Sequence, residues 1–184
     1  MKKIRVEDAI GETLCHDMTG ISASGVKGVM FKRGHIIAQS DIPTLLNIGK
    51  SHLFVWEPEA DEVHEDDAAL ALAEAICGDN LNYDKKPSEG KIQINAAVDG
   101  VFFLNRDALK RINSVPDYTV ASLPNYTKVT STQKLGGLRI VPLVTKRQNV
   151  EEAVRIAKDN FPVFTVLPYK PLKCGVIITG SEVY

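Results

Sequence analysis

The sequence predicts an α+β protein, and three patterns within its 184 residues lead to that class. Apolar residues recur at helical spacing in segments 65–77 and 150–157. Between these segments, apolar and polar residues alternate with a period of two, which is typical of half-buried strands. A continuous apolar run follows at 175–178, as in strands buried on both faces. We therefore predict an N-terminal mixed α/β portion, a compact mainly-β (barrel-like) module, and the first strand of a further α/β domain.

The first 88 residues are predicted to hold short helices and strands. The letters VEDAIG indicate a helical turn that ends at Gly11, and GVKGVMFKRG indicates an extended segment. Asp41 is expected to cap a short helix that tolerates Pro43 in its first turn and ends at Gly49. The next predicted strand is HLFVWE.

The clearest predicted helix begins at the acids of 65–67, which the positive end of the helix dipole favours. Its apolar stripe ends before Gly78. The polar stretch after it contains Pro87 and Gly90 and is typical of a linker. A domain boundary is therefore predicted near residue 88.

Residues 89–148 are predicted to form the mainly-β module. IQINAAV and VFFLN are separated by Asp99-Gly100, a pair that supplies the positive φ angles of a two-residue turn, so a hairpin is expected. The letters RDALKRINS indicate a short helix. Further strands are indicated by YTVASLP, TKVT and LRIVPLVT.

Residues 149–170 are predicted to form a helix and a strand that connect back. Asn149 is expected to cap the helix, with Glu152 as its partner in a capping box, and FTVLP is the strand. Residues 171–184 then contain CGVIITG, the predicted first strand of a domain that the chain does not complete.

Composition and charge exclude several classes of function. The 22 Lys and Arg residues are scattered and are balanced by 23 Asp and Glu residues, so nucleic acid is not an expected partner. No apolar run reaches the length of a membrane span, and the N-terminal acids argue against a signal peptide. The 3 cysteines lack CxxC spacing and favour a reducing cytoplasm.

Two groups of polar residues are candidates for chemistry. His16 and Asp17 would suit a base with its orienting carboxylate, but neighbours in a strand point to opposite faces. His64 and Asp67 have ligand-type side chains at i, i+3, but the helix dipole alone explains acids in a first turn. The sequence contains no GxGxxG, P-loop, GxSxG or HExxH motif, so it carries no self-sufficient catalytic constellation.

Polar residues suited to ligand binding follow the last predicted strand directly. Open α/β sheets place ligands at such strand ends, because glycine allows close backbone approach and hydroxyl or carboxylate groups offer hydrogen bonds. An ordinary strand-to-loop turn explains the same letters equally well. The pattern therefore leaves both interpretations open for Thr179, Gly180, Ser181 and Glu182.

The letters GVIITGSEVY resemble the opening strand and loop of a molybdopterin-binding domain. In the molybdopterin molybdenumtransferase family, which includes the gephyrin E-domain, that strand commonly ends in TGDEL or TGNE. VEDAIGETLCHDM and GVMFKRGHIIAQSDIPTLLNIG are similar to two earlier segments of that family, and PYKPLKCGVIITG to the approach to its binding strand. The resemblance covers both ends of the chain and only loosely residues 60–165.

The resemblance implies the N-terminal part of a longer cytoplasmic protein that serves molybdenum cofactor biosynthesis or handling and forms a homodimer. Molybdopterin would be the cofactor of the full-length protein, with molybdate and Mg²⁺ as further ligands, and none is expected on these residues alone. The implied cofactor-binding residues are Thr179, Gly180, Ser181 and Glu182. Glu182, Val183 and Tyr184 are expected to be poorly ordered or to make unrelated contacts.

Two departures from the family pattern leave the role open. Ser181 replaces the usual acid, and the DNSAMDGYA-type segment is absent between HDMTGI and SASGVKGVMF. A molybdate-inserting transferase and a non-catalytic module for cofactor binding, delivery or sensing, with this chain as a dimerisation scaffold, are both compatible. The nucleotide chemistry of competence-damage-type proteins fits less well, because their binding domain begins near the N-terminus. A dimerising β-rich domain with an unrelated last strand is the remaining alternative.

Overall fold

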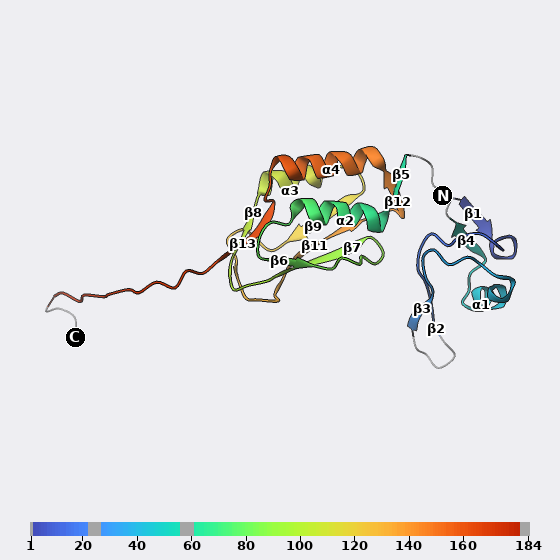
Figure 1. Cartoon of the computed structure of the whole chain (residues 1–184), viewed down its shortest axis with the longest axis horizontal. Helices are drawn as coiled ribbons and strands as arrows, with labels where there is room; N and C mark the ends of the chain where they lie inside the picture. Colours follow the sequence, from blue (N-terminus) through green and yellow to red (C-terminus); the bar gives the residue numbers. More distant parts are fainter. Residues whose placement is uncertain (1, 22–26, 56–60, 181–184) are drawn as a thin grey trace.

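The computed structural model describes residues 2–21, 27–55 and 61–180, and these residues form a mixed α+β structure. Their buried apolar side chains fall into two clusters, one within residues 6–55 and one within residues 68–166. We call residues 2–55 the N-terminal part and residues 61–168 the central part. Figure 1 shows the two parts side by side, with residues 169–180 leaving the central part as an extended segment.

The N-terminal part consists of two antiparallel strand pairs and short helical elements. Strand β1 (Lys2–Arg5) pairs with β4 (His52–Val55), and β2 (Met18–Ile21) pairs with β3 (Lys27–Phe31). The helical elements are η1 (Val6–Asp8), η2 (Gln39–Asp41) and α1 (Ile42–Asn47). Leu14, Leu45 and Leu53 are buried among them and form the centre of this small core.

The turns predicted for the N-terminal part are confirmed, whereas one cap is not. Gly11 and Gly49 end their helical turns with φ of 85° and 80°, a left-handed backbone that favours glycine. The Asp41 carboxylate accepts hydrogen bonds from the Ala38 main-chain N–H at 2.9 Å and from the His35 ring at 2.7 Å. Asp41 thus stands at the N-cap position of α1, but its side chain closes the turn before the helix.

The central part is a four-stranded antiparallel sheet with three helices over one face (Figure 1). Its strand order is β6-β7-β11-β9, with β6 (Leu81–Tyr83), β7 (Lys91–Ala96), β9 (Tyr118–Ser122) and β11 (Lys134–Ile140). The helices are α2 (Glu65–Ile76), α3 (Arg106–Ile112) and α4 (Arg147–Asp159). A further sheet holds β8 (Gly100–Leu104), β10 (Lys128–Val129) and β13 (Phe164–Pro168), and β5 (Glu62–His64) pairs with β12 (Val144–Lys146).

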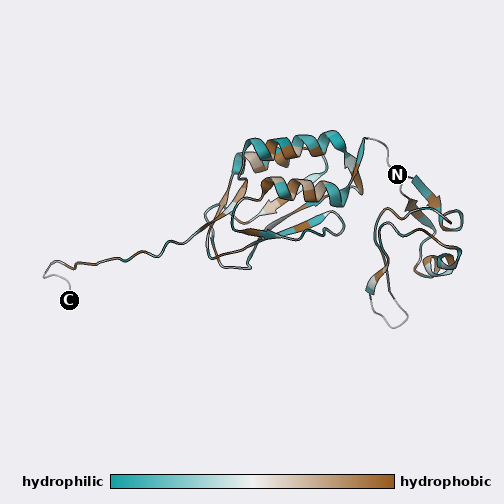
Figure 2. Cartoon of the chain, viewed as in Figure 1, coloured by the Kyte–Doolittle hydropathy of each residue, from teal (hydrophilic) through white to brown (hydrophobic). Residues whose placement is uncertain are grey.

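The strand alternation predicted from the sequence places the core between the sheet and the helices. In β7, Ile92 and Ile94 are buried, whereas Lys91 and Gln93 are exposed. Figure 2 shows α4 with hydrophilic residues along its outer side, and α2, which packs against α4, β7 and β11, as more hydrophobic. Burial of this apolar surface is the main force that holds the layers together.

The hairpin predicted around Asp99-Gly100 is wrong. Strand β7 pairs with β6 and β11, while β8 pairs with β10 and β13, so the two strands belong to different sheets. The Asp99 carboxylate accepts a hydrogen bond from the Ser131 main-chain N–H at 2.7 Å. Gly100 is needed for close approach, because a Cβ there would overlap the Leu167 carbonyl group of β13. The pair therefore lets the chain cross from one sheet to the other.

The barrel-like module is also not found, because the described strands form separate sheets and no closed barrel. A layer of helices covers the four-stranded sheet instead. Helix α2 and strand β6 pack into the same core as the residues after 88. The sequence had placed both elements before the predicted domain boundary near residue 88. The change between the two apolar clusters falls between Val55 and Val63.

Helix α4 begins three residues earlier than predicted, and Asn149 does not cap it. The helix starts at Arg147, and the side-chain amide of Asn149 donates to the Asp117 carboxylate at 3.2 Å and to the Thr145 hydroxyl at 3.3 Å. The Thr145 hydroxyl itself donates to Asp117 at 2.7 Å. Asn149, predicted as part of a capping box, thus forms a polar contact between α4 and the turn before β9.

Residues 169–180 form no strand and are exposed along their whole described length. Val176, Ile177 and Ile178 are 83%, 88% and 78% exposed. The strand predicted at CGVIITG is therefore not formed within the described residues. Among the described helices, none combines the length and apolar character needed to cross a membrane.

Candidate functional site

The structure does not assemble the ligand site predicted at the end of the chain. Thr179 and Gly180 are exposed on the extended segment, and no described element packs against them. Gly180 has a φ of 120°, a conformation that glycine tolerates. Ser181 and Glu182 lie outside the described residues. The same holds for Val183 and Tyr184, so the structure does not test the disorder expected at residues 182–184.

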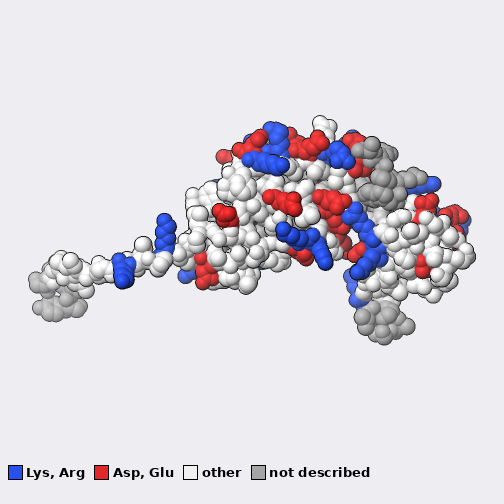
Figure 3. All heavy atoms as spheres, in the orientation of Figure 1, with Lys and Arg blue, Asp and Glu red and all other residues white. Residues whose placement is uncertain are grey.

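A second candidate lies where the N-terminal part meets the first turn of α2. A cavity of about 340 Å³ opens between them, and we call it the junction pocket. Charged side chains of both signs lie along this junction in Figure 3. The pocket is lined by His16, Asp17, Phe54, His64, Glu65, Asp66, Ser88, Glu89, Arg139, Val141 and Leu143.

His64 connects the two parts and also caps α2. The side chain is 1% exposed, and its Nε2–H donates to the Cys15 carbonyl oxygen at 2.7 Å. Its Nδ1 accepts a hydrogen bond from the Asp66 main-chain N–H at 3.1 Å. Burial lowers the pKa of His64, and the acceptor role of Nδ1 likewise favours the neutral ring. His64, which the sequence offered with Asp67 as a ligand-type side chain, is a buried N-cap.

Asp66 and Arg33 form a second link across the junction. One Asp66 oxygen accepts the Gly90 main-chain N–H at 2.9 Å, and the other lies 3.8 Å from the Arg33 guanidinium. Arg33 also donates to Asp67 at 3.0 Å, and its main-chain N–H donates to Asp17 at 2.8 Å. Asp66 and Asp67 therefore bind the N-terminal part, and the dipole of α2 also favours their negative charge.

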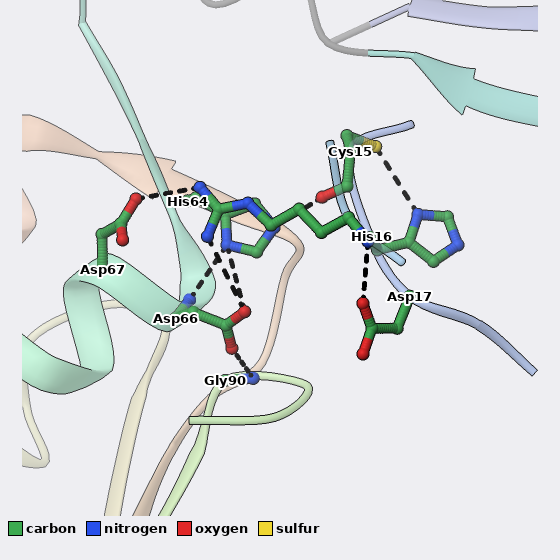
Figure 4. Close-up of polar contacts among 8 residues, drawn as sticks. Cys15, His16, Asp17, His64, Asp66, Asp67 and Gly90 are labelled. Atoms are coloured by element: carbon green, nitrogen blue, oxygen red, sulfur yellow. Dashed lines mark hydrogen bonds and ion pairs between the residues drawn. The ribbon is translucent and has the colours of Figure 1, made fainter. Parts of the chain in front are cut away.

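His16 and Asp17 do not form the dyad considered from the sequence. Figure 4 shows the His16 ring beside the Cys15 sulfur, and its Nδ1 lies 3.5 Å from that sulfur. The Asp17 carboxylate instead accepts a hydrogen bond from the Arg33 main-chain N–H. Burial lowers the pKa of His16 and raises the pKa of the Cys15 thiol to about 11, so this thiol is a poor nucleophile. The Cys15 thiol donates instead to the Phe54 carbonyl oxygen at 2.9 Å.

The turn Ser88–Lys91 forms one wall of the junction pocket. Glu89 and Gly90 have φ of 53° and 66°, and the Lys91 N–H donates to the Ser88 carbonyl oxygen at 3.1 Å, as in a two-residue turn of type I′. A Cβ at Gly90 would lie 2.9 Å from both the Glu65 carboxyl and the Ile140 carbonyl oxygen. The predicted linker is therefore an ordered turn that packs tightly against the start of α2.

The burial of the Glu65 side chain was not predicted from the sequence. It is only 8% exposed, and burial raises the pKa of its carboxyl from 4.5 to about 7, with a further upward contribution from the Asp66 carboxylate. The sequence shows three successive acids at a helix start, and periodicity does not tell which of them points inward. Only the fold of β5 and of the turn at Gly90 encloses this one.

No group of three or more His, Cys, Asp or Glu side chains among the described residues is arranged to hold a metal ion. His64 and Asp67, weighed from the sequence as ligand-type neighbours, take the Cys15 carbonyl and Arg33 as separate partners. His35 contacts Asp41 at 2.7 Å within the N-terminal part.

Comparisons with known proteins agree with the extent of the N-terminal part. The family model of a domain of unknown function (DUF8806) matches residues 3–57. The match ends next to the last residue of the first apolar cluster, Val55. Searches of curated proteins and of solved structures found no match.

Proposed function

We propose that the chain is the N-terminal part of a molybdopterin-binding protein and that residues 174–182 enter its cofactor-binding domain. The observation that carries this proposal is the exposed apolar segment before Thr179 and Gly180. Three consecutive apolar side chains, at Val176, Ile177 and Ile178, are each at least 78% exposed. Contiguous exposed apolar residues mark interaction surfaces, because leaving them in water is costly.

The sequence of this segment favours a strand as its bound form. A continuous run of β-branched apolar residues suits a strand that is covered on both faces, as in a parallel sheet with helices on either side. In such a sheet, residues that follow the strand reach the ligand crevice. Thr179, Gly180, Ser181 and Glu182 would then contact the cofactor, as the resemblance of GVIITGSE to the family's binding strand implies.

In this proposal the N-terminal and central parts act as a scaffold. Their cores are complete without the extended segment, since the described members of both clusters lie within residues 4–166. The central part would hold the start of the cofactor-binding domain, and the N-terminal part would be available for contacts within a homodimer. Molybdate insertion by the full-length protein remains one version of this function, and cofactor storage, delivery or sensing is the other.

Calorimetric titration of the full-length protein with molybdopterin, under anaerobic conditions, tests the proposal. We expect saturable binding at micromolar concentration and weaker binding by the Glu182→Gln variant. Glu151→Gln changes an exposed carboxylate on α4 and serves as the matched control, with unchanged affinity expected. Absence of saturable binding at micromolar ligand would overturn the proposal.

A molybdate insertion assay on the same protein distinguishes the two versions. Turnover of molybdopterin with molybdate and Mg²⁺ identifies a transferase. Tight binding without turnover identifies a carrier or sensor, which Ser181 favours, because it removes a negative charge beside an anionic ligand.

A further inference from the structure

Glu65 is the one acid of the junction pocket with no hydrogen bond or ion pair from its side chain to another described residue. Each of the other acids that line the pocket has such a partner. Asp17 accepts from the Arg33 main chain, Asp66 from Gly90, and Glu89 from the Lys91 ammonium at 2.7 Å. Buried polar groups in proteins are nearly always hydrogen-bonded, so the exception calls for an explanation.

The carboxyl of Glu65 is open to the cavity. Every fully buried side-chain nitrogen or oxygen of the described residues has a hydrogen-bond partner. The Glu65 oxygens have none, so protein atoms do not enclose them fully, although the residue is only 8% exposed. The residue lines the junction pocket, and its Oε2 lies beside Gly90 on the wall of that cavity.

The remaining lining specifies the chemistry of a ligand. Four acids and one arginine line the cavity, so its charge favours a donor or a cation over an anion. Phe54, Val141 and Leu143 provide apolar walls. A carboxylate accepts two parallel hydrogen bonds best from two N–H groups on one carbon atom, the geometry by which guanidinium groups bind carboxylates.

We propose that the junction pocket binds a small planar ligand through an amidine-type N–C–N donor pair, which the Glu65 carboxylate holds with two hydrogen bonds. The apolar body of the ligand lies against Phe54 and Leu143. A cavity of about 340 Å³ is large enough for one aromatic ring with its amidine group. This inference does not depend on the proposed role of residues 174–182, which lie on the extended segment.

Because the pocket lies between the two parts of the chain, a bound ligand also affects their association. Its lining comes from both parts of the chain, with His16, Asp17 and Phe54 from the N-terminal part and Glu65 and Arg139 from the central part. A ligand that contacts both sides adds interactions across a junction held by His64 and Arg33. Binding should therefore stabilise the association of the two parts.

Benzamidine is the probe for this proposal, and calorimetry or ligand-observed NMR at pH 8 is the measurement. Benzamide and benzoate have the same ring without the charged donor pair, and both should bind more weakly. Glu65→Gln should weaken benzamidine binding about 10- to 100-fold, the effect of removing a charged hydrogen-bond partner. Glu74→Gln, an exposed carboxylate on the same helix, should leave the affinity unchanged.

A second variant keeps the test decisive if Glu65→Gln alters the fold. Val141 lines the pocket and is 62% exposed, so Val141→Arg should fold normally and place a competing cation at the cavity. We expect this variant to lose benzamidine binding with an unchanged circular dichroism spectrum. Benzamidine binding no tighter than benzamide, or equal binding by the wild type and both pocket variants, would overturn the proposal.

Acetyl-arginine amide distinguishes a small planar ligand from an arginine side chain of a peptide. It carries the same donor pair on a flexible chain without an aromatic ring. We expect it to bind more weakly than benzamidine, because it loses the contact with Phe54 and more conformational entropy. Tighter binding of this compound would contradict the planar apolar body that we assign to the ligand.

Discussion

Glutamine in place of Glu65 should stabilise the protein at alkaline pH and progressively less as the pH falls. The folded pKa of about 7 lies above the ordinary value of 4.5, so folding disfavours the charged carboxylate. Below pH 4.5 the group is protonated in both states and this cost is absent. The cost grows as the pH rises toward 7 and is constant above it.

The size of this effect follows from the pKa difference and is about 3 kcal/mol at most. A glutamine amide in the same place has its own desolvation cost, but that cost does not change with pH. The quantity to follow is therefore the difference in free energy of unfolding between Glu65→Gln and the wild type. Between pH 5 and pH 8 this difference should grow by about 2 kcal/mol in favour of the variant.

Urea denaturation followed by far-UV circular dichroism at several pH values measures this difference. Asp66, Glu89, Lys91 and Arg139 also act on the Glu65 carboxyl, and the substitution leaves all of them in place. Glu74→Gln on the exposed side of α2 is the control and should show no such growth. A difference that stays constant from pH 5 to pH 8 would refute the buried, unpartnered state of this carboxyl.

Three further predictions concern packing and the junction. Gly90→Ala should destabilise the protein by about 1 to 3 kcal/mol in urea denaturation, because φ is 66° and the new Cβ meets Glu65 and Ile140, whereas Gly28→Ala, with no atom within 4 Å, should change little. Phe164→Ala should cost about 3 to 5 kcal/mol by the same assay, since this ring is fully buried against Phe102; a loss below 1 kcal/mol would contradict the core described here. Arg33→Ala should cost about 0.5 to 1 kcal/mol at low salt and less in 0.5 M NaCl, because its carboxylate partners are partly exposed; a salt-independent loss would argue against a role for these ion pairs.

The sequence predicted most elements of the central part, because their signals are local. The helices at 65–76 and 106–112 and the strand at 118–122 lie where spacing and alternation placed them, whereas the predicted strand LRIVPLVT is divided between the end of β11 and β12. Strand partners were not predictable in the same way, since they depend on contacts between distant residues. Asp99-Gly100 has the letters of a tight turn, yet Gly100 is required by the close approach of β13, about 67 residues later in the chain.

The junction pocket could not be predicted for the same reason. His16, Phe54, Glu65 and Arg139 come from four separated segments, and none of them belongs to a motif. The acids at 65–67 were explained sufficiently by the helix dipole, and that explanation holds for Asp67, which is exposed and pairs with Arg33. It does not hold for Glu65, whose burial depends on the turn at Gly90 and on β5.

The free energy that burial of the charged Glu65 carboxylate costs raises the question of why an acid occupies this position. Asp66 and Asp67 already supply negative charge at the start of α2, so a third carboxylate adds little to the helix, while its burial opposes folding at neutral pH. Residues that lower stability are concentrated at functional sites, where a ligand supplies the interaction that the folded chain lacks. If glutamine both stabilises the protein and abolishes benzamidine binding, the cost of Glu65 is explained by ligand recognition. If it stabilises the protein and leaves binding unchanged, the carboxylate has only a structural effect and the pocket is no amidine site.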